Sequence, residues 1–414
     1  MALETRRRTA IEALSPTVPL RFRLADATID QSDRAEVAQW LTSDAQLTQG
    51  PVVFQFEQQW SDWLGRRYSV FVNSGSSANL IMYYAALVSR RAPRRRVVVP
   101  AIAWATTIAP AIQLGFEPIM CDADAQTFGL DLNQLEDVCR KDPPDAVITV
   151  QTLGVPGDMR GLAALQERYG FLLMEDACPA TGSTYRDRRV GTFGDMATFS
   201  LYFGHHLSTI EGGVVSTDDS YLYDLLLELR SHGWAKDLDA ETEAELSRKN
   251  NVLEFNRIFT FYVPGFNVRN TDLAARFGLT QMRKVDWVVE RRCVNQEVYE
   301  SRFSNQPGFS FPRNPAGRTC SISFVALAAS REHRDRVAAA LRANGIETRP
   351  LGGGSMGRQP FWTERYGQVR MPVADAIHER SFMLPNHPYL TQQDVHEICD
   401  VALSVAAGES GRAA

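Results

Sequence analysis

Short apolar runs alternate with amphipathic stretches through the first two-thirds of the chain. Ser77–Leu87 and Leu162–Tyr169 repeat their apolar positions with the 3.6-residue period of a helix. Strands separated by helices indicate βαβ units and a mainly parallel sheet. The runs that predict strands are rich in β-branched and other apolar residues, and they lie at Val97–Pro100, Pro118–Asp122, Asp145–Val150, Phe171–Glu175, Ala197–Leu201 and Gly213–Ser216.

The last third has a different order of elements. A long stretch of helical period from Leu279 to Phe303 predicts one helix, and Ser321–Ala328 predicts a strand. A helix over Arg331–Asn344 ends at Gly345, and Thr391 with Asp394 predicts the capped start of a final helix. The pattern divides the chain into an N-terminal arm (1–20), a large α/β domain (21–283), a small C-terminal α+β domain (284–407) and a disordered tail (408–414).

Composition and charge narrow the class of protein. The chain has 414 residues, of which 44% are hydrophobic and 22% charged, which is typical of a globular enzyme. No apolar run approaches the roughly 18 residues of a membrane-spanning helix, so we expect no membrane partner. The net charge of −5 argues against nucleic acid as a main partner. Only four of the 44 basic residues are lysines: Lys141, Lys236, Lys249 and Lys284.

The six cysteines are widely scattered, and Cys121 and Cys139 are the closest pair. Such spacing predicts no disulfide framework, no metal site and no iron–sulfur cluster. We therefore expect buried free thiols and a cytoplasmic location. The N-terminus lacks the apolar core of a signal peptide, which favours a surface arm.

Two segments could hold a phosphorylated ring. Gly75 and Ser76 lie where a strand-like run passes into a helix, and backbone amides at such a helix start can bind phosphate. A plain helix cap explains the same residues. Asp176 ends a buried strand, where its carboxylate could hold a protonated ring nitrogen. Its alternatives are a helix cap and a metal ligand.

The adjacent pair His205 and His206, followed by Glu211-Gly-Gly, is the densest signal in the sequence. Imidazole can pass protons in both directions near neutral pH. A shared metal ion is the competing interpretation, although side chains of neighbouring residues point apart. Gly352–Gly357 formally satisfies G-x-G-x-x-G, but Pro360 and Trp362 indicate that no helix follows, so we interpret it as a flexible loop.

In combination these segments resemble the sugar aminotransferase/dehydratase family known as the DegT/DnrJ/EryC1/StrS group. The resemblance spans about residues 22 to 407. It implies the aspartate aminotransferase-like fold of type I enzymes that use pyridoxal 5'-phosphate (PLP), with a mainly parallel seven-stranded sheet in the large domain. The motifs that carry it are Asn73-Ser-Gly-Ser-Ser, Pro100-Ala-Ile-Ala-Trp-Ala-Thr, Glu175-Asp-Ala-Cys, Gly191-Thr-Phe-Gly, His205 to Gly213, and Pro264-Gly-Phe-Asn-Val-Arg.

One departure from the family pattern is informative. Most members hold PLP covalently through a lysine six residues before the Glu-Gly-Gly glutamate, where this chain has His205. Imidazole cannot form a stable imine with an aldehyde. With a histidine at this position the chain resembles a small branch of the family, the 4-keto-6-deoxy-sugar 3-dehydratases. Within that branch it is most similar to the enzymes that act on GDP-4-keto-6-deoxy-mannose. The alternatives are an aminotransferase that uses another lysine, a dehydratase of nucleoside-antibiotic sugars, and a non-catalytic scaffold.

The resemblance also implies roles for single residues. His205 would move protons while noncovalent pyridoxamine 5'-phosphate (PMP), regenerated by L-glutamate, removes the C3 hydroxyl of a nucleotide- or nucleoside-linked 4-keto sugar. Arg269 would bind the glutamate carboxylate or the substrate diphosphate, and His206 would be structural. In a homodimer with shared sites, the cofactor would be held by Gly75, Ser76 and Ser200 at the phosphate, Trp104 stacked on the ring, Asp176 at the ring nitrogen and Asn267 from the neighbouring subunit. Pro179 replaces a residue that is often polar in relatives.

Overall fold

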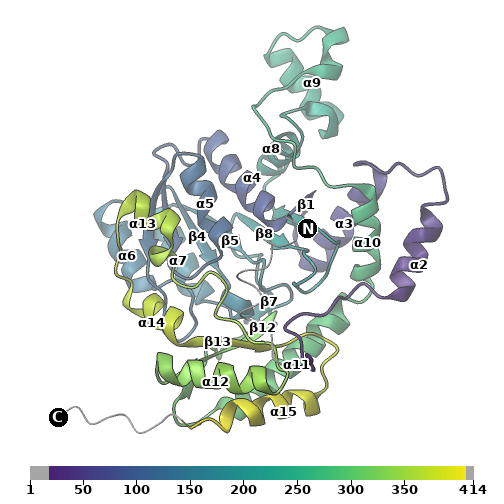
Figure 1. Cartoon of the computed structure of the whole chain (residues 1–414). Helices are drawn as coiled ribbons and strands as arrows, with labels where there is room; N and C mark the ends of the chain where they lie inside the picture. Colours follow the sequence, from purple (N-terminus) through teal and green to yellow (C-terminus); the bar gives the residue numbers. More distant parts are fainter. Residues whose placement is uncertain (1–17, 407–414) are drawn as a thin grey trace, which may run out of the picture.

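A seven-stranded sheet forms the centre of the fold (Figure 1). The computed structural model describes residues 18–406, so most of the predicted arm and all of the predicted tail lie outside the described residues. Six strands run in one direction and β9 runs against them. The strand order is β1 (Tyr68–Val72), β9 (Gly213–Thr217), β8 (Met196–Ser200), β5 (Leu172–Asp176), β4 (Ala146–Val150), β2 (Arg96–Pro100) and β3 (Glu117–Cys121). The predicted mainly parallel sheet is confirmed.

Helices cover both faces of this sheet because successive side chains of each strand point to opposite faces. In β1, Val70 and Val72 pack into one apolar cluster and Phe71 into another. The first cluster lies under α4 (Gly75–Val88), α5 (Ala105–Gln113) and α8 (Ser220–Arg230). The opposite face is covered by α3 (Pro51–Leu64), α10 (Asp272–Met282), α6 (Leu132–Lys141) and α7 (Met159–Tyr169).

The C-terminal third builds a smaller antiparallel sheet. Its order is β10 (Phe309–Ser310), β12 (Ser323–Ala328) and β13 (Ser381–Pro385). The capping box of Thr391 and Asp394 starts α15 as predicted. Around this sheet lie α11 (Val285–Phe303), α12 (Arg331–Ala343), α14 (Pro372–Arg380) and α15 (Gln392–Leu403), and a further small sheet joins β6 (Thr184–Tyr185), β7 (Arg188–Arg189) and β11 (Gly317–Arg318).

The single helix expected from Leu279 to Phe303 is wrong. α10 ends at Met282 and α11 begins at Val285, and Lys284 between them has a non-helical φ of −120° and ψ of 9°. The Lys284 ammonium binds Asp30 and Asp33 beside α2 (Gln31–Trp40), at 2.9 and 2.6 Å. The sequence has no glycine or proline at this break, and its apolar residues keep the helical period across it. The local pattern therefore predicted one continuous helix.

The sequence expectation also fails after the glycine-rich loop. α13 (Pro360–Tyr366) begins directly behind it, with Pro360 in the first turn. Proline suits that position because its fixed φ is helical and its missing N–H would have no partner there. The helix is short and does not form a βαβ unit, so the segment still lacks the setting of a dinucleotide-binding fingerprint.

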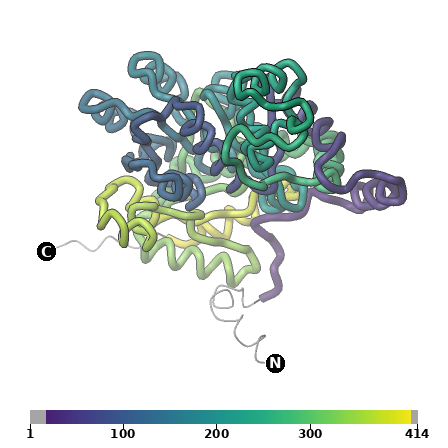
Figure 2. Tube along the Cα trace, turned by 90° about the horizontal axis from the view of Figure 1, so that it is seen from above, coloured from purple at the N-terminus to yellow at the C-terminus, as the bar shows by residue number. Residues whose placement is uncertain are grey.

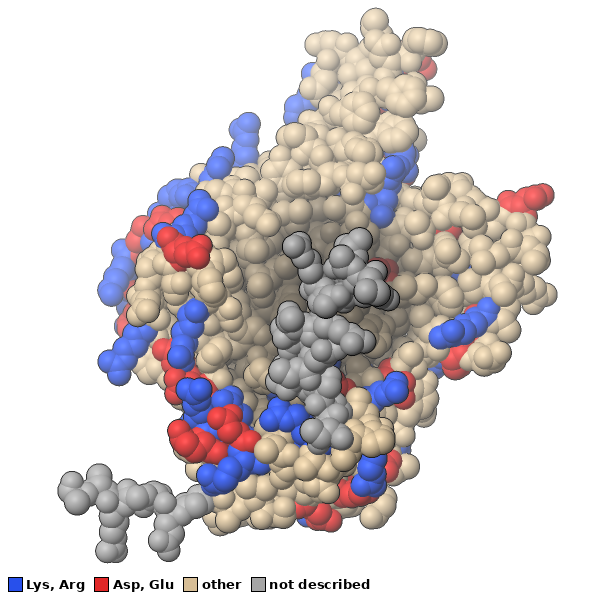
Figure 3. Space-filling view, viewed as in Figure 1, with Lys and Arg blue, Asp and Glu red and all other residues tan. Residues whose placement is uncertain are grey.

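A segment between α8 and α10 projects from the body of the molecule (Figure 1), and in the view from above it lies over that body (Figure 2). It contains α9 (Ala240–Lys249) and the short helix η4 (Glu254–Phe259). We call residues 235–263 the projecting segment, and its visible face carries few charged side chains (Figure 3). Several of its apolar side chains are exposed, namely Leu253, Phe255, Ile258, Phe259 and Phe261.

Among residues 18–406, no helix combines the length and the apolar character needed to cross a membrane.

Candidate active site

The predicted site residues lie along one edge of the large sheet. Asp176 and Ser200 are the last residues of β5 and β8, and Gly75 and Trp104 follow the ends of β1 and β2. The turn that carries His205 enters the same edge because β9 runs in the opposite direction. Carboxyl ends of parallel strands are the usual position of ligand sites in such sheets. The fold therefore brings together residues that are far apart in the sequence.

The start of α4 offers free donors at this edge. The Ser74 side chain caps the helix by accepting the Ser77 amide at 3.0 Å, whereas the amides of Gly75 and Ser76 donate to no other group of the described residues. The Ser76 hydroxyl donates to Thr106 at 3.0 Å. A Cβ at Gly75 would come within 2.7 Å of the Ser200 Cβ, so only glycine fits beside that serine.

Asp176 is a buried carboxylate held by neutral donors. Its Oδ2 accepts the Thr107 hydroxyl at 2.6 Å and the Asn79 amide at 2.9 Å, and its Oδ1 accepts the Cys178 backbone N–H at 3.1 Å. No lysine, arginine or histidine of residues 18–406 forms an ion pair with it. A buried charge without a partner is costly, so this carboxylate is suited to a ligand that brings a positive charge.

Two of these partners, Asn79 and Thr107, were missed by the sequence analysis. Asn79 lies one helical turn after Gly75. It extends the network to Thr198, whose hydroxyl donates to the side-chain oxygen Oδ1 of Asn79 at 2.6 Å. Thr107 lies one turn after Trp104. Each is a polar residue one helical turn after a predicted site residue, Gly75 or Trp104, and this spacing is the signal that could have identified both.

The His205 imidazole is oriented by a backbone carbonyl. Its Nδ1 lies 2.8 Å from the carbonyl oxygen of Cys178, two residues beyond Asp176. Because a carbonyl only accepts, Nδ1 must carry the proton, which leaves Nε2 with a free electron pair. Burial lowers the pKa of His205, as does the Arg292 guanidinium, while the Cys178 carbonyl and Asp176 oppose that change. His205 is thus held as a neutral base.

The two histidines face different partners. His206 Nε2 lies 2.9 Å from the Cys320 carbonyl oxygen, and burial lowers the pKa of His206 well below its usual value. The prediction that neighbouring histidines point apart is confirmed. No group of three or more potential metal ligands occurs in the described part of the chain. Five of the six free thiols are buried as expected, whereas Cys178 beside the site is only partly buried.

Trp104 lies at the mouth of this edge, 62% exposed. The glycine-rich loop of the C-terminal part packs against Trp104. A Cβ atom added at Gly352 would lie 3.7 Å from the indole ring. Gly353 has a φ of +80°, and a side chain there would collide with the Ala103 carbonyl oxygen. The loop therefore packs beside Trp104, and the stacking of Trp104 on a ring stays a prediction.

Asn267 and Arg269 lie beside the end of β1. The backbone of Arg269 bridges to Val72, and its Nε donates to the Asn267 side-chain oxygen at 3.2 Å. Asn267 itself is exposed, next to the base of the projecting segment. Both residues are close to the start of α4, and their ligands stay a prediction.

Comparison with known proteins decides the family. A model of the DegT/DnrJ/EryC1/StrS aminotransferase family matches residues 27–402. The chain belongs to this family. The family predicted from the sequence motifs is therefore confirmed, together with its PLP type I fold.

Three similar proteins are informative within the family. The chain is 31% identical to the GDP-4-keto-6-deoxy-D-mannose 3-dehydratase of Yersinia pseudotuberculosis, over 81% of this chain and 85% of that protein. It superimposes with a TM-score of 0.84 on the E. coli enzyme of that activity with bound hydrated PLP, at 26% identity, covering 93% of this chain and all of that one. A structure of such a dehydratase with a trapped PLP–glutamate geminal diamine gives a TM-score of 0.83 at 28% identity, covering 92% and 100%.

A lysine is expected at the His205 position in most members of the family. The positions of the four lysines of this chain therefore decide whether another lysine could take its place. Lys284 binds Asp30 and Asp33, and Lys236 binds Asp237. Lys141 ends α6, and Lys249 ends α9 in the projecting segment. None of the four hydrogen-bonds to a predicted site residue among the described residues.

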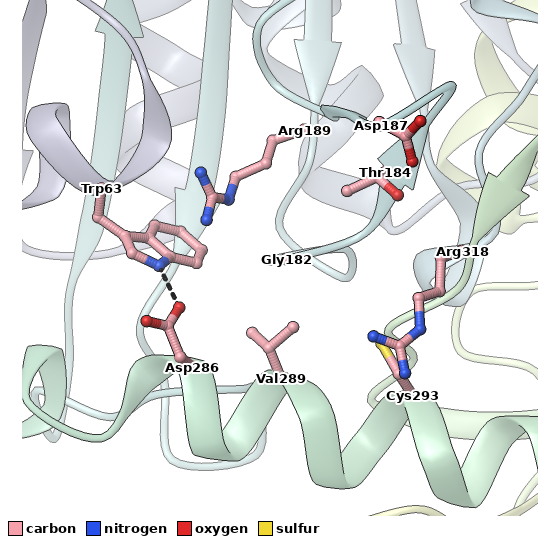
Figure 4. Close-up of a pocket in the computed structure, with 9 residues that line it drawn as sticks. All are labelled: Trp63, Gly182, Thr184, Asp187, Arg189, Asp286, Val289, Cys293 and Arg318. Atoms are coloured by element: carbon pink, nitrogen blue, oxygen red, sulfur yellow. Dashed lines mark hydrogen bonds between the residues drawn. The ribbon is translucent and has the colours of Figure 1, made fainter.

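A separate cavity of about 280 Å³ lies between α3, the β6–β7 hairpin and α11 (Figure 4). Trp63 donates to Asp286 across its wall at 2.9 Å, and the Arg189 guanidinium lies 4.7 Å from the Trp63 ring. None of the predicted site residues lines it. The cavity is therefore distinct from the candidate site at the strand ends.

Proposed function

We propose that this chain is a 3-dehydratase that uses PLP and PMP to remove the C3 hydroxyl of a nucleotide-linked 4-keto sugar. The observation that carries the proposal is His205, which presents a free Nε2 beside Asp176 where no lysine reaches. An imidazole there can move protons but cannot tether an aldehyde. The names of the similar dehydratases support the same reaction and favour a GDP-linked sugar.

The residues present fit a pyridoxal phosphate. The free amides of Gly75 and Ser76 at the start of α4, with Ser200 beside them, suit its phosphate. Asp176 has no positive partner among the described residues, and a pyridinium N–H would supply one. When bound, the protonated ring acts as an electron sink for bond cleavage next to the amine. Since no lysine is in reach, we propose noncovalent binding and L-glutamate as the amine donor.

The chain's own groups then divide the work. Asp176 keeps the ring nitrogen protonated, and Asn79 and Thr107 keep that carboxylate in place. His205 Nε2 accepts a proton from the bound reactant, and the protonated imidazole can return it to the departing C3 hydroxyl. Trp104 would cover the open side of the ring, and Arg269 would bind a carboxylate or diphosphate.

The test is an incubation of the purified protein with PMP, L-glutamate and a panel of nucleotide- and nucleoside-linked 4-keto-6-deoxy sugars. Mass spectrometry should show one of them converted to a product with one oxygen atom fewer, because the C3 hydroxyl leaves as water while PMP supplies two hydrogens and becomes PLP with release of ammonia. GDP-4-keto-6-deoxy-mannose is the first substrate to try. An amino sugar as product, or a pyridoxyl-lysine peptide after borohydride reduction, would contradict the proposal and favour an aminotransferase that uses another lysine.

We further propose that the active form is a homodimer with shared sites, working in the cytoplasm where the free thiols stay reduced. The projecting segment exposes Phe255 to 92% and Leu253 to 71%, and a monomer rarely leaves such side chains clustered in water. Asn267 lies at the base of this segment, where it could reach a second copy. Light scattering should give twice the mass of the chain, and Phe255→Glu should lower it.

A further inference from the structure

Arg292, on α11, is a buried cation whose partners are all backbone carbonyls. It is 1% exposed, and no carboxylate of residues 18–406 forms an ion pair with it. Its Nη2 donates to the His205 carbonyl oxygen at 3.0 Å. Its Nη1 faces the carbonyl oxygens of Ser321 and Ile322, at 3.3 and 3.2 Å, and that of Asn386.

These carbonyls belong to two separate parts of the fold. His205 lies on the turn between β8 and β9 of the large sheet, whereas Ser321, Ile322 and Asn386 flank β12 and β13 of the C-terminal sheet. The Asn386 side chain binds back to the Arg292 carbonyl oxygen at 3.2 Å. One guanidinium therefore fastens the catalytic turn to the C-terminal sheet, with the planar fork that only arginine offers.

Charged and titratable groups from several elements lie around His205, and the thiol of Cys178, whose pKa burial raises, is one of them. Asp176 acts from the end of β5, Arg292 from α11 and His206 from the same turn, while the Tyr202 ring lies 6.4 Å away. Burial lowers the pKa of His205 and Arg292 acts in the same direction, whereas the Cys178 carbonyl and Asp176 act against them. Because carbonyl dipoles rather than an anion surround it, the Arg292 charge stays effective at the imidazole.

We infer that Arg292 is a positioning residue for His205. Its bond to the His205 carbonyl holds the turn so that Nδ1–H meets Cys178 and Nε2 stays free toward the site. The role of this geometry in catalysis rests on the proposed dehydration, but the geometry itself does not. Arg291 is a matched control, since it lies next along α11 and also binds only carbonyls, those of Pro388 and Leu390.

The first test needs no cofactor or substrate. Protein labelled with ¹⁵N-histidine is titrated by NMR, and the His205 signals are assigned by their loss in His205→Asn. In wild type and Arg291→Met we expect one tautomer, protonated at Nδ1. In Arg292→Met we expect a mixture of tautomers and a titration midpoint at higher pH. Identical His205 spectra in the two methionine variants would overturn the inference.

The second test uses turnover, once dehydration has been found in wild type. Arg292→Met should displace the His205 imidazole from the reacting atoms. We expect kcat to fall by about 10- to 100-fold while KM changes little. Arg292→Lys, which keeps the charge but loses the fork, should recover part of kcat, and it serves in both tests if Arg292→Met does not fold. Equal losses in Arg291→Met would reduce Arg292 to a structural role. Without dehydration in wild type, the NMR result still decides.

Discussion

Arg230 lies between two carboxylates, whereas neither Asp176 nor Arg292 forms an ion pair with any of residues 18–406. Arg230 is fully buried and lies 2.5 Å from Glu57 and 3.1 Å from Asp237, and Lys236 binds Asp237 from the other side. Burial raises the pKa of Glu57, while Arg230 acts to lower it. This cluster, at the base of the projecting segment, is neutral within itself.

The cluster at the strand ends is built differently. Asp176 is satisfied by an amide, a hydroxyl and a backbone N–H, and Arg292 by carbonyls, so each keeps a charge that the protein does not neutralise. A buried charge that is paired with an opposite charge is already compensated within the fold. A buried charge without such a partner can interact with a ligand or with a neighbouring imidazole. The charges at the strand ends can therefore act on a ligand or on His205, whereas those around Arg230 balance one another within the fold.

The largest effect should come from His205. In His205→Asn the free Nε2 is lost, so we expect kcat for dehydration to fall by about 10²- to 10⁴-fold, the usual contribution of a general acid–base group. Formation of the 3-deoxy sugar, which has one oxygen atom fewer than the substrate, is followed by mass spectrometry. His232→Asn, at an exposed histidine outside the site, should keep full activity. Equal turnover in the two variants would remove His205 from the mechanism.

Breaking the balanced cluster should affect stability. Arg230→Met leaves Glu57 buried without a cation and Asp237 with Lys236 alone, so we expect the free energy of unfolding to fall by about 3–5 kcal/mol. Urea denaturation followed by circular dichroism gives this value. If the loss stays below about 1 kcal/mol, as for exposed pairs, the cluster is not the tight unit described above.

The surroundings of Arg292 include His387, and this histidine should make the stability of the protein depend on pH. Burial lowers the pKa of His387 to about 4 from 6.5. The unfolded chain therefore takes up a proton at higher pH than the folded protein does. We expect the free energy of unfolding to fall between pH 6.5 and 4 by up to about 3 kcal/mol more in wild type than in His387→Gln. Parallel pH curves for both proteins would contradict this.

The smallest effect concerns the support of Asp176. Thr107→Val removes a 2.6 Å hydrogen bond to a buried carboxylate, so we expect about 2 kcal/mol less stability in urea denaturation. Thr106→Val is the control, since the Thr106 hydroxyl only accepts from Ser76 nearer the surface. Equal losses would show that the Asp176 network is no stronger than an ordinary contact.

Sequence patterns identified most strands of the large sheet because strands buried on both faces form continuous apolar runs. The break at Lys284 was not visible in the local pattern, and the partners that Lys284 binds there, Asp30 and Asp33, lie about 250 positions away. The same holds for Asn79 and Thr107, whose importance comes only from a shared contact with Asp176.

The sequence by itself determined the family, the sheet and the replacement of a lysine by His205, because these depend on residue type and local spacing. Only the tertiary structure decided that Cys178 orients the imidazole, that Gly75 must fit against Ser200, and that Arg292 joins the catalytic turn to the C-terminal sheet. Residue types are local properties of a chain, whereas a hydrogen bond or a buried charge exists only once distant segments have packed together.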